Sequence, residues 1–422
     1  MMQTRLARMI VVMGVLGFTG VSAAQYTQWG GPKQDFKFKS KGLATDWPAE
    51  GPPKLWSREL GVGYSGILAD KGRLYTMYRG DAKEVVIALD AKTGETLWEH
   101  RYDAPIHEKH QRTFNAGPRG TPLLSGKRLY TIGCSGKMHC LSAKTGKVYW
   151  SHDLWKKFDG TFLMHGYASS PFAYKKTVIV MVGGEGHSLI ALDKKTGDVK
   201  WKKLDFKNSY SSPKLIEVDG QDQLLCYMAQ ELVGVDPKNG KQLWSYSIGN
   251  QFNQNITLPL WGKDHILFLT SAVAGSRGLK LTQKDNKTTV KELWSNRKMK
   301  IHHSNAVRVG KYVYASSGGM GRPGIFWAID VKTGKVAWRE RGFDKATCLY
   351  ADGRFIILDE NGNLGLATAT PEFFEVHAKA SILEPLEASK TWTLPTLVGR
   401  TLYLRDSTKI MALDLGKGSQ KS

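Results

Sequence analysis

The chain is poor in the residues that would commit it to thiol, zinc or membrane chemistry. Cysteine is scarce: the 422 residues include four, and none of them forms a C-x-x-C pair, which excludes the usual zinc-ribbon and thiol-redox spacings. Beyond the N-terminus, no apolar run approaches the roughly 20 residues that a membrane-spanning helix needs. Cys134 and Cys140 flank an expected turn, and the sequence leaves open either a disulfide across that hairpin or two buried free thiols.

Acidic residues are also in short supply. Lys and Arg number 60 against 38 Asp and Glu, which gives a formal net charge of +22. A charge of this size attracts polyanions at long range and is weakened by salt. The sequence leaves two interpretations open, namely solubility from dispersed lysines and attraction to an anionic partner.

The N-terminus predicts export. Basic residues precede an apolar run from Met9 to Phe18, and small residues follow at Val21–Ala24, as signal peptidase requires. We therefore expect a signal peptide at residues 1–24 and a mature, periplasmic or secreted protein from residue 25 to 422. Export argues against nucleic acid and favours an envelope protein or anionic ligand as partner, and we expect a monomer without a transmembrane segment.

One motif recurs along the chain and ends in tryptophan. Its clearest copy, Ala88–Trp98, has an apolar strand, a turn that starts with Asp, a Gly suited to the left-handed turn position, and a second strand ending in Trp. A copy ending at Trp294 has Asp285-Asn286 at its turn and no Gly there. The other copies are Cys140–Trp150, Ala191–Trp201, Gly234–Trp244 and Ala328–Trp338.

The spacing of the motif predicts a β-propeller. Successive motif tryptophans are 43 to 52 residues apart, enough for a four-stranded antiparallel blade, and radial repetition of blades gives a propeller. The last blade lacks a Trp strand, so we expect the strand around Trp56 to complete it and close the ring. The prediction is an all-β, eight-bladed propeller, or seven-bladed if the segment near 280 is an insertion. The expected blade-docking residues are Trp56, Trp98, Trp150, Trp201, Trp244, Trp294, Trp338 and Phe374.

The Asp-x-x-Thr-Gly-x-x-x-Trp repeat resembles the quinoprotein alcohol dehydrogenase-like superfamily. That superfamily includes pyrroloquinoline quinone (PQQ) dehydrogenases and the non-enzymatic BamB assembly lipoproteins. The chain is more narrowly similar to exported PQQ-like repeat proteins of planctomycetes. The matching stretches are Gly117–Pro122, Tyr210–Pro213, Arg341–Lys345, Leu358–Gly362 and Ala367–Pro371.

The resemblance implies two alternative functions. One is a non-catalytic envelope scaffold, similar to BamB, that binds a protein or an anionic ligand. The other is a PQQ-dependent alcohol or sugar dehydrogenase with an atypical site, for which PQQ and calcium are the implied cofactors. The chain departs from both groups, since it has neither the adjacent cysteines of the dehydrogenases nor the N-terminal lipidated cysteine of BamB.

The propeller topology predicts which residues meet at one mouth of the channel. Linkers entering the inner strands and the middle hairpin of each blade should line that mouth, whereas the Lys-Thr-Gly turns should lie on the opposite face. Aromatic, Arg, His and Asn side chains suit a planar anionic ligand, although linker polarity and interblade packing are the alternative interpretation. The candidates are Tyr64, Arg119, His165, Tyr167, His187, Tyr210, Asn255, Arg277, His302, His303, Arg322, Lys345 and Trp392.

Other motifs do not predict chemistry. His107 and His110 have no assignable third metal ligand, Asp359–Asn363 is expected to be a hairpin turn and not a calcium loop, and no catalytic residues or metal site can be assigned. A tryptophan-floored pocket at the mouth, as opposed to an open funnel, would be the most informative structural observation.

Overall fold

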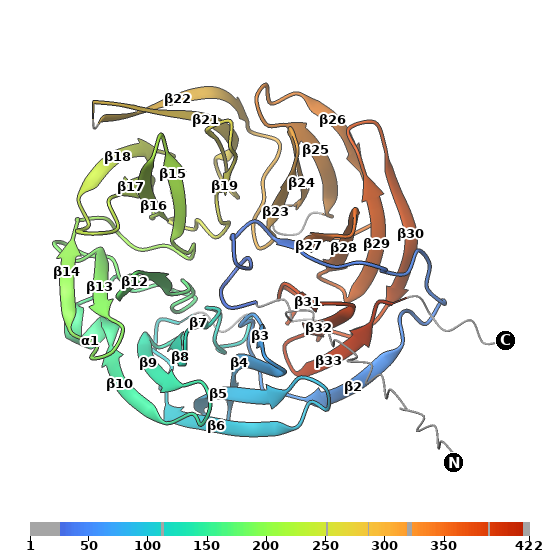
Figure 1. Cartoon of the computed structure of the whole chain (residues 1–422), viewed down its shortest axis with the longest axis horizontal. Helices are drawn as coiled ribbons and strands as arrows, with labels where there is room; N and C mark the ends of the chain where they lie inside the picture. The colour runs from blue at the N-terminus through green and yellow to red at the C-terminus, as the bar shows by residue number, and fades with distance from the viewer. Residues whose placement is uncertain are drawn as a thin grey trace, which may run out of the picture.

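The computed structural model describes residues 26–110, 114–249, 252–285, 287–318, 323–386 and 389–416. These residues form eight β-sheets arranged radially around one axis (Figure 1). The all-β, eight-bladed prediction is confirmed, and the segment near 280 is the outer hairpin of a blade and not an insertion. The predicted signal peptide lies outside the described residues.

Seven blades are formed by consecutive strands, from the innermost to the outermost. The first blade comprises β3 (Leu68–Asp70), β4 (Arg73–Gly80), β5 (Lys83–Asp90) and β6 (Thr96–Asp103), and the second comprises β7 (Leu123–Ser125), β8 (Arg128–Ile132), β9 (Lys137–Ser142) and β10 (Val148–Asp153). The third comprises β11 (Phe172–Tyr174), β12 (Thr177–Met181), β13 (Leu189–Asp193) and β14 (Val199–Lys203), and the fourth comprises β15 (Lys214–Val218), β16 (Gln221–Tyr227), β17 (Glu231–Val235) and β18 (Gln242–Ser247). The fifth blade comprises β19 (Leu260–Trp261), β20 (Ile266–Ser271), β21 (Gly275–Lys284) and β22 (Lys287–Asn296). The sixth comprises β23 (Ala306–Val309), β24 (Tyr312–Ser317), β25 (Ile325–Asp330) and β26 (Val336–Glu340), and the seventh comprises β27 (Ala346–Ala351), β28 (Arg354–Asp359), β29 (Asn363–Ala369) and β30 (Phe374–Ser381).

The eighth blade joins the two ends of the chain. β31 (Thr396–Val398), β32 (Thr401–Arg405) and β33 (Lys409–Asp414) pair in order, and the N-terminal β2 (Lys54–Glu59) adds antiparallel to β33. Trp56 lies opposite Ala412 in that register. The strand around Trp56 therefore completes the last blade, as the sequence predicted, and protects an edge that would otherwise be open.

The repeated motif joins each blade to the next. The Trp98 indole donates a hydrogen bond to the Ala143 carbonyl in the following blade (3.1 Å), and its ring lies over Gly146. Corresponding Nε1 contacts join Trp56 to Ala91, Trp150 to Lys194, Trp294 to Val331 and Trp338 to Thr370.

Three motif positions depart from this pattern. Trp201 packs on the Gly240 turn without a recorded Nε1 bond, and Phe374 stacks on Trp338. Trp244 donates instead to Gln223 of its own blade (2.7 Å). The blade after Trp244 has no Gly turn at this position, so the missing partner was visible in the sequence.

An N-terminal strap, residues 26–47, crosses one end of the channel. Backbone hydrogen bonds connect Tyr26 to Ala69 of β3, and Thr27 to Leu124 of β7, while β1 (Lys37–Phe38) pairs parallel with β27. Phe36 is fully buried among the inner strands. In Figure 1 the dark-blue strap runs from the ring centre across the β27–β30 blade. The repeat pattern of the sequence does not predict this closure, because the strap lies outside the repeats.

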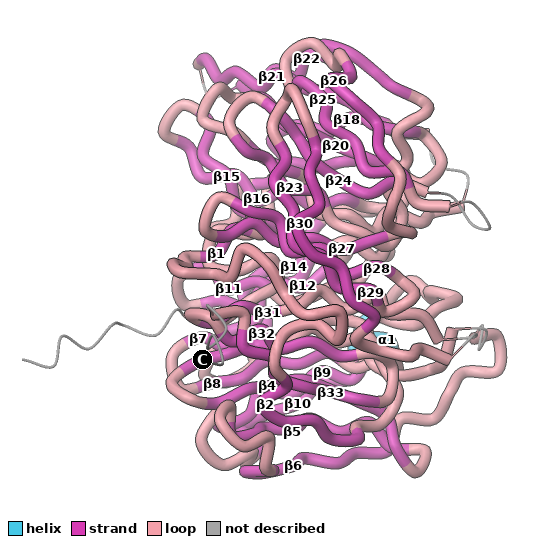
Figure 2. Tube along the Cα trace, turned by 90° about the vertical axis from the view of Figure 1, so that its right-hand side faces the viewer, coloured by secondary structure: helices cyan, strands magenta, loops and turns pink. Residues whose placement is uncertain are grey.

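The two faces of the disc carry different segments. Figure 2 views the disc edge-on, with β1 toward one face and the short α1 (Leu154–Phe158) toward the other. No helix in the described part of the chain combines the length and apolarity needed to cross a membrane. All four cysteines are buried free thiols, including Cys134 and Cys140.

Candidate functional site

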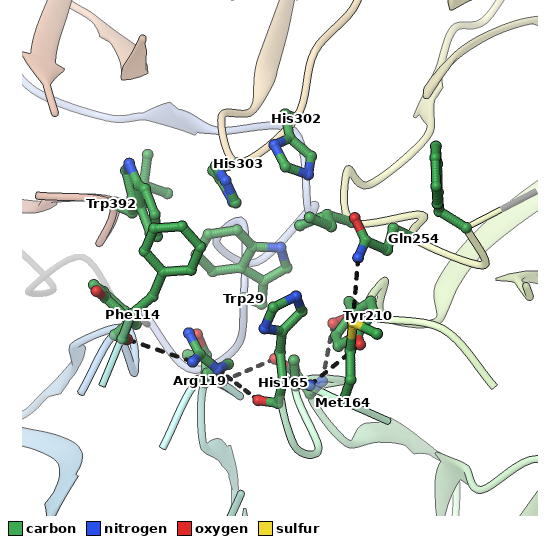
Figure 3. Close-up of a pocket in the computed structure, with 18 residues that line it drawn as sticks. Trp29, Phe114, Arg119, Met164, His165, Tyr210, Gln254, His302, His303 and Trp392 are labelled. Carbon is green, nitrogen blue, oxygen red and sulfur yellow. Dashed lines mark hydrogen bonds between the residues drawn. The ribbon is translucent and has the colours of Figure 1, made fainter. Parts of the chain in front are cut away.

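A cavity of about 470 Å³ lies at the channel end opposite the strap. Its walls come from the linkers that enter β3, β7, β11, β15, β19, β23 and β31, and the Trp29 indole of the strap lies at its centre (Figure 3). Because the strap closes the channel from the other face, Trp29 forms the floor. The mouth is thus a tryptophan-floored pocket of the size that small ligands occupy.

One wall is a stack of aromatic rings. His303 lies against Trp392 with ring centroids 4.0 Å apart and planes 13° from parallel, and His302 packs on His303 at 3.8 Å. The Trp392 indole donates to Glu360 (3.0 Å), and the same carboxylate oxygen pairs with Lys345 at 3.2 Å. This ion pair fixes the tilt of Trp392 and hence of the wall.

The cavity histidines are uncharged at neutral pH. Burial, reinforced by Arg119, lowers the pKa of His165 to about 4. Burial and the Lys345 ammonium lower the pKa of His302 to about 4, and burial holds the pKa of His303 well below its usual value. The rings therefore offer stacking surface and neutral imidazole nitrogens.

Arg119 supplies the positive charge. Of the described residues that line the cavity, it alone carries a permanent charge. Its Nε donates to the His165 carbonyl (2.7 Å), its Nη2 donates to the Asn115 carbonyl (2.9 Å), and the guanidinium lies 5.2 Å from the Tyr64 ring centroid. These contacts hold the guanidinium at the cavity wall.

An arc of hydroxyl groups lines another side. Thr121 Oγ1 accepts the Gly66 N–H (3.3 Å), Ser170 Oγ accepts the Thr121 N–H (3.0 Å), and Ser212 Oγ accepts the Ser170 N–H (2.9 Å). A hydroxyl that accepts a backbone N–H still has its own proton to donate. The arc can therefore bind acceptor oxygens of a ligand.

The predicted mouth residues divide into two groups. Seven line the cavity, namely Tyr64, Arg119, His165, Tyr210, His302, His303 and Trp392. Five do not: Tyr167, His187, Asn255, Arg277 and Lys345. Arg322 lies outside the described residues.

The five residues away from the cavity make structural contacts instead. The buried Tyr167 hydroxyl donates to the Met181 carbonyl, and Asn255 Nδ2 donates to the Met228 carbonyl (2.8 Å). His187 Nδ1 bonds the Gly183 carbonyl (2.9 Å), and Arg277 pairs with Glu292 (3.5 Å). His187 and Arg277 thus bond within their own blades, whereas Asn255 joins the linker into β19 to the preceding blade.

Five lining residues were not predicted from the sequence, namely Trp29, Phe114, Met164, Phe252 and Gln254. Trp29 had a usable signal, because it precedes the first repeat and is followed by two glycines. Gly30 and Gly31 both adopt positive φ (77° and 80°), which turns the chain sharply after the indole. The others lie in linkers that have no periodic pattern.

Of the two cofactors that the resemblance implies, PQQ and calcium, the cavity suits PQQ better. A stacking floor and wall, one guanidinium and several hydroxyl donors fit a planar ring system with carboxylates, such as PQQ. Calcium takes 6–8 oxygen ligands, most of them carboxylates. None of the described lining residues is Asp or Glu, so the cavity does not fit a calcium ion.

Two motifs that the sequence analysis set aside, Asp359–Asn363 and the His107–His110 segment, lie away from the cavity. Asp359 Oδ1 accepts the N–H groups of Asn361 and Asn363 (3.0 and 2.9 Å), which makes this segment the β28–β29 turn, as predicted. His107 is exposed, whereas His110 is buried, so only part of that linker is solvated.

Comparison with known proteins places this architecture in the PQQ-like propeller class. The family model described as outer membrane protein assembly factor BamB matches residues 82–340, more than half of the chain, and the chain belongs to this family. Two quinohemoprotein alcohol dehydrogenases of Pseudomonas putida are similar over shorter segments. ADH-IIG is 28% identical over 155 residues (35% of this chain, 20% of the relative), and ADH IIB is 32% identical over 123 residues (28% and 17%).

Solved structures agree on the fold. The quinohemoprotein alcohol dehydrogenase of Comamonas testosteroni superimposes with a TM-score of 0.63 at 14% identity, covering 94% of this chain and 82% of that one. The computationally designed Ika8 protein gives a TM-score of 0.59 at 10% identity, with 86% of this chain and 100% of that one covered. The matched segments span about a fifth of the length of the dehydrogenase relatives, so the similarity concerns the propeller architecture.

Proposed function

We propose that this protein is an exported, non-catalytic binding propeller that holds a small planar anion in the Trp29-floored cavity. The observation that carries the proposal is the combination of stacked rings, Arg119 and the hydroxyl arc in one enclosed space. The rings offer a stacking surface, Arg119 offers a positive charge and the hydroxyl groups offer hydrogen-bond donors, and these are the contacts that hold a planar anion. The BamB description of the family supports a binding role in the cell envelope.

A second candidate function is PQQ-dependent oxidation of an alcohol or sugar. It is supported by the dehydrogenase relatives and by the fit of a planar carboxylate to the cavity. In that case Trp29 and Trp392 would stack on the cofactor, Arg119 would bind a cofactor carboxylate, and the cofactor would supply the redox chemistry. The neutral His165 or His302 imidazole would then be the group available to take a proton.

Binding of PQQ and of simple aromatic dicarboxylates, measured by absorbance or calorimetry with and without calcium, tests the proposal. We expect binding that does not require calcium and that Arg119→Gln weakens about 10- to 100-fold, since charge-assisted hydrogen bonds contribute roughly 1.5–3 kcal/mol. Arg297→Gln, at an exposed position, is the matched control.

Two outcomes would overturn the proposal. Equal binding by both arginine variants would show that the ligand does not occupy this cavity. Alcohol- or sugar-dependent dye reduction by the PQQ-loaded protein would establish the dehydrogenase instead.

A further inference from the structure

The face opposite the cavity carries a set of outward-pointing lysines. Four Asp-starting turns and the equivalent turn that starts with Ser142 each present an exposed lysine to solvent, namely Lys92, Lys195, Lys238, Lys332 and, in the Ser142 turn, Lys144. In each of the four Asp-starting turns the aspartate is half-buried and caps the turn backbone. Asp90 Oδ1, for example, accepts the N–H groups of Lys92 and Thr93 at 2.8 and 3.0 Å. The lysine side chains of these turns are thus exposed to solvent on this face.

The strap adds to the same face. The turn after β9 lies beside the turn after β7, since the Ala143 N–H donates to the Lys127 carbonyl (3.0 Å). The strap runs over equivalent inner turns of other blades, because Ser40 Oγ donates to the Gly399 carbonyl (2.6 Å) and the Leu43 N–H donates to Asp352 (3.0 Å). Alternate strap residues Lys37, Lys39 and Lys41 are exposed there.

We propose that this basic face, formed by the turn lysines and the strap lysines, docks the propeller on an anionic lipid surface with the cavity mouth pointing away. Flexible lysines on the turns of a broad disc face match a diffuse planar charge better than they match a discrete acidic groove. The arrangement leaves the cavity open to solvent and does not depend on what the cavity binds, so this proposal and the proposed function fail independently.

Vesicle co-sedimentation of the full chain tests the docking. The probes are phosphatidylcholine vesicles with and without 30% phosphatidylglycerol, at low and physiological salt. The test variant replaces Lys92, Lys144 and Lys332 with Glu. The control makes the same charge change at Lys109, Lys207 and Lys298, which are exposed in linkers on the cavity side. Each lysine near an anionic surface strengthens binding roughly fivefold, so we expect the test variant to bind at least about 100-fold more weakly.

We expect the control variant to bind anionic vesicles nearly as well as the unaltered protein does. Neither of these two proteins should bind neutral vesicles. Equal losses in both variants would reduce the effect to net charge and overturn the proposal, as would no preference for anionic vesicles. An acidic protein partner would then be the remaining occupant.

A footprint on the unaltered protein requires no variant to fold. Amine acylation followed by mass spectrometry should show Lys92, Lys144 and Lys332 protected on anionic vesicles, with Lys109, Lys207 and Lys298 labelled as in solution. Protection of the second set instead would reverse the orientation and overturn the proposal.

Discussion

A cluster of buried polar residues lies between the first two blades of the ring. His139 is 7% exposed, its ring lies 4.3 Å from the Tyr102 ring, and no partner is recorded for its Nδ1 atom in the described structure. Burial, together with His100 and Lys137, lowers the pKa of His139 to about 3. Nearby, Glu84 is buried but accepts the Cys134 N–H (2.7 Å) and the Tyr102 hydroxyl (2.9 Å). The surroundings of His139 therefore favour its neutral imidazole over the protonated imidazolium.

His139 is therefore expected to make the fold acid-sensitive. In the folded protein the pKa of His139 lies below the value of about 6.5 expected for the unfolded chain. The free energy of unfolding is therefore unaffected above that pH and decreases as pH falls toward 3. At pH 4 the decrease is about 3 kcal/mol. His139→Phe should show a smaller drop in melting temperature between pH 7 and pH 4 than the unaltered protein. The exposed His107→Phe variant is the control and should show the full drop. Equal drops in all three proteins would contradict the prediction.

At the scale of the structural element, the Gly turn and the preceding blade's tryptophan form one unit. A Cβ at Gly146 would lie 2.5 Å from the Trp98 ring, and the residue also has φ of 72°. Gly126, in the inner turn of the same blade, has a similar φ of 62° with nothing within 4 Å of a Cβ. The two positions separate backbone strain from the interblade contact.

Gly146→Ala should destabilise the protein more than Gly126→Ala. Both variants incur the cost of a left-handed Ala, about 1 kcal/mol, but only Gly146→Ala displaces Trp98, which adds typically 1–3 kcal/mol. Denaturant midpoints and the quenching of tryptophan fluorescence would measure the difference. Similar midpoints for the two variants would mean that the Trp98 contact contributes little to blade cohesion.

How far the sequence predicts these elements depends on local periodicity. The strands, turns and docking tryptophans follow from a motif of about eleven residues, because most of the turns have a capping Asp or Ser and a Gly at fixed positions. The candidate site was predicted less completely. Linker position placed Arg119 and His303 at the channel mouth, where both line the cavity. It did not predict the orientation of Tyr167 or Asn255, whose side chains donate to buried carbonyls instead.

At the scale of the whole molecule, the closure of the ring depends on a few long-range contacts. Arg405 is fully buried where the last blade meets the first. Its Nη1 donates to the Met77 carbonyl (2.8 Å), its Nη2 to the Gly61 carbonyl (3.1 Å), and its Nε to the Asp406 carbonyl (3.1 Å). Together with β2, this guanidinium holds the seam between the ends of the chain.

Arg405→Met should open the seam before the rest of the ring. Removing one partner from buried hydrogen bonds leaves the carbonyls unpaired, at roughly 1–3 kcal/mol each. Hydrogen exchange should therefore accelerate in residues 54–59 and 409–414 and stay unchanged in the β15–β18 blade across the ring. Arg339→Met, an exposed arginine over Trp327, controls for loss of charge. Uniform acceleration in all blades would contradict a local seam.

The sequence by itself determined the blade and the closure by the Trp56 strand, because turn chemistry and strand alternation act over a few residues and repeat; it left the number of blades at eight or seven, and the structure shows eight. Only the tertiary structure decided that the channel has a floor. The strap is not part of any repeat, and its anchors lie far along the chain, as when Gln34 Nε2 donates to the Pro213 carbonyl 179 residues away. Such contacts depend on the assembled ring, since the surfaces that hold Trp29 exist only after blades distant in sequence have come together.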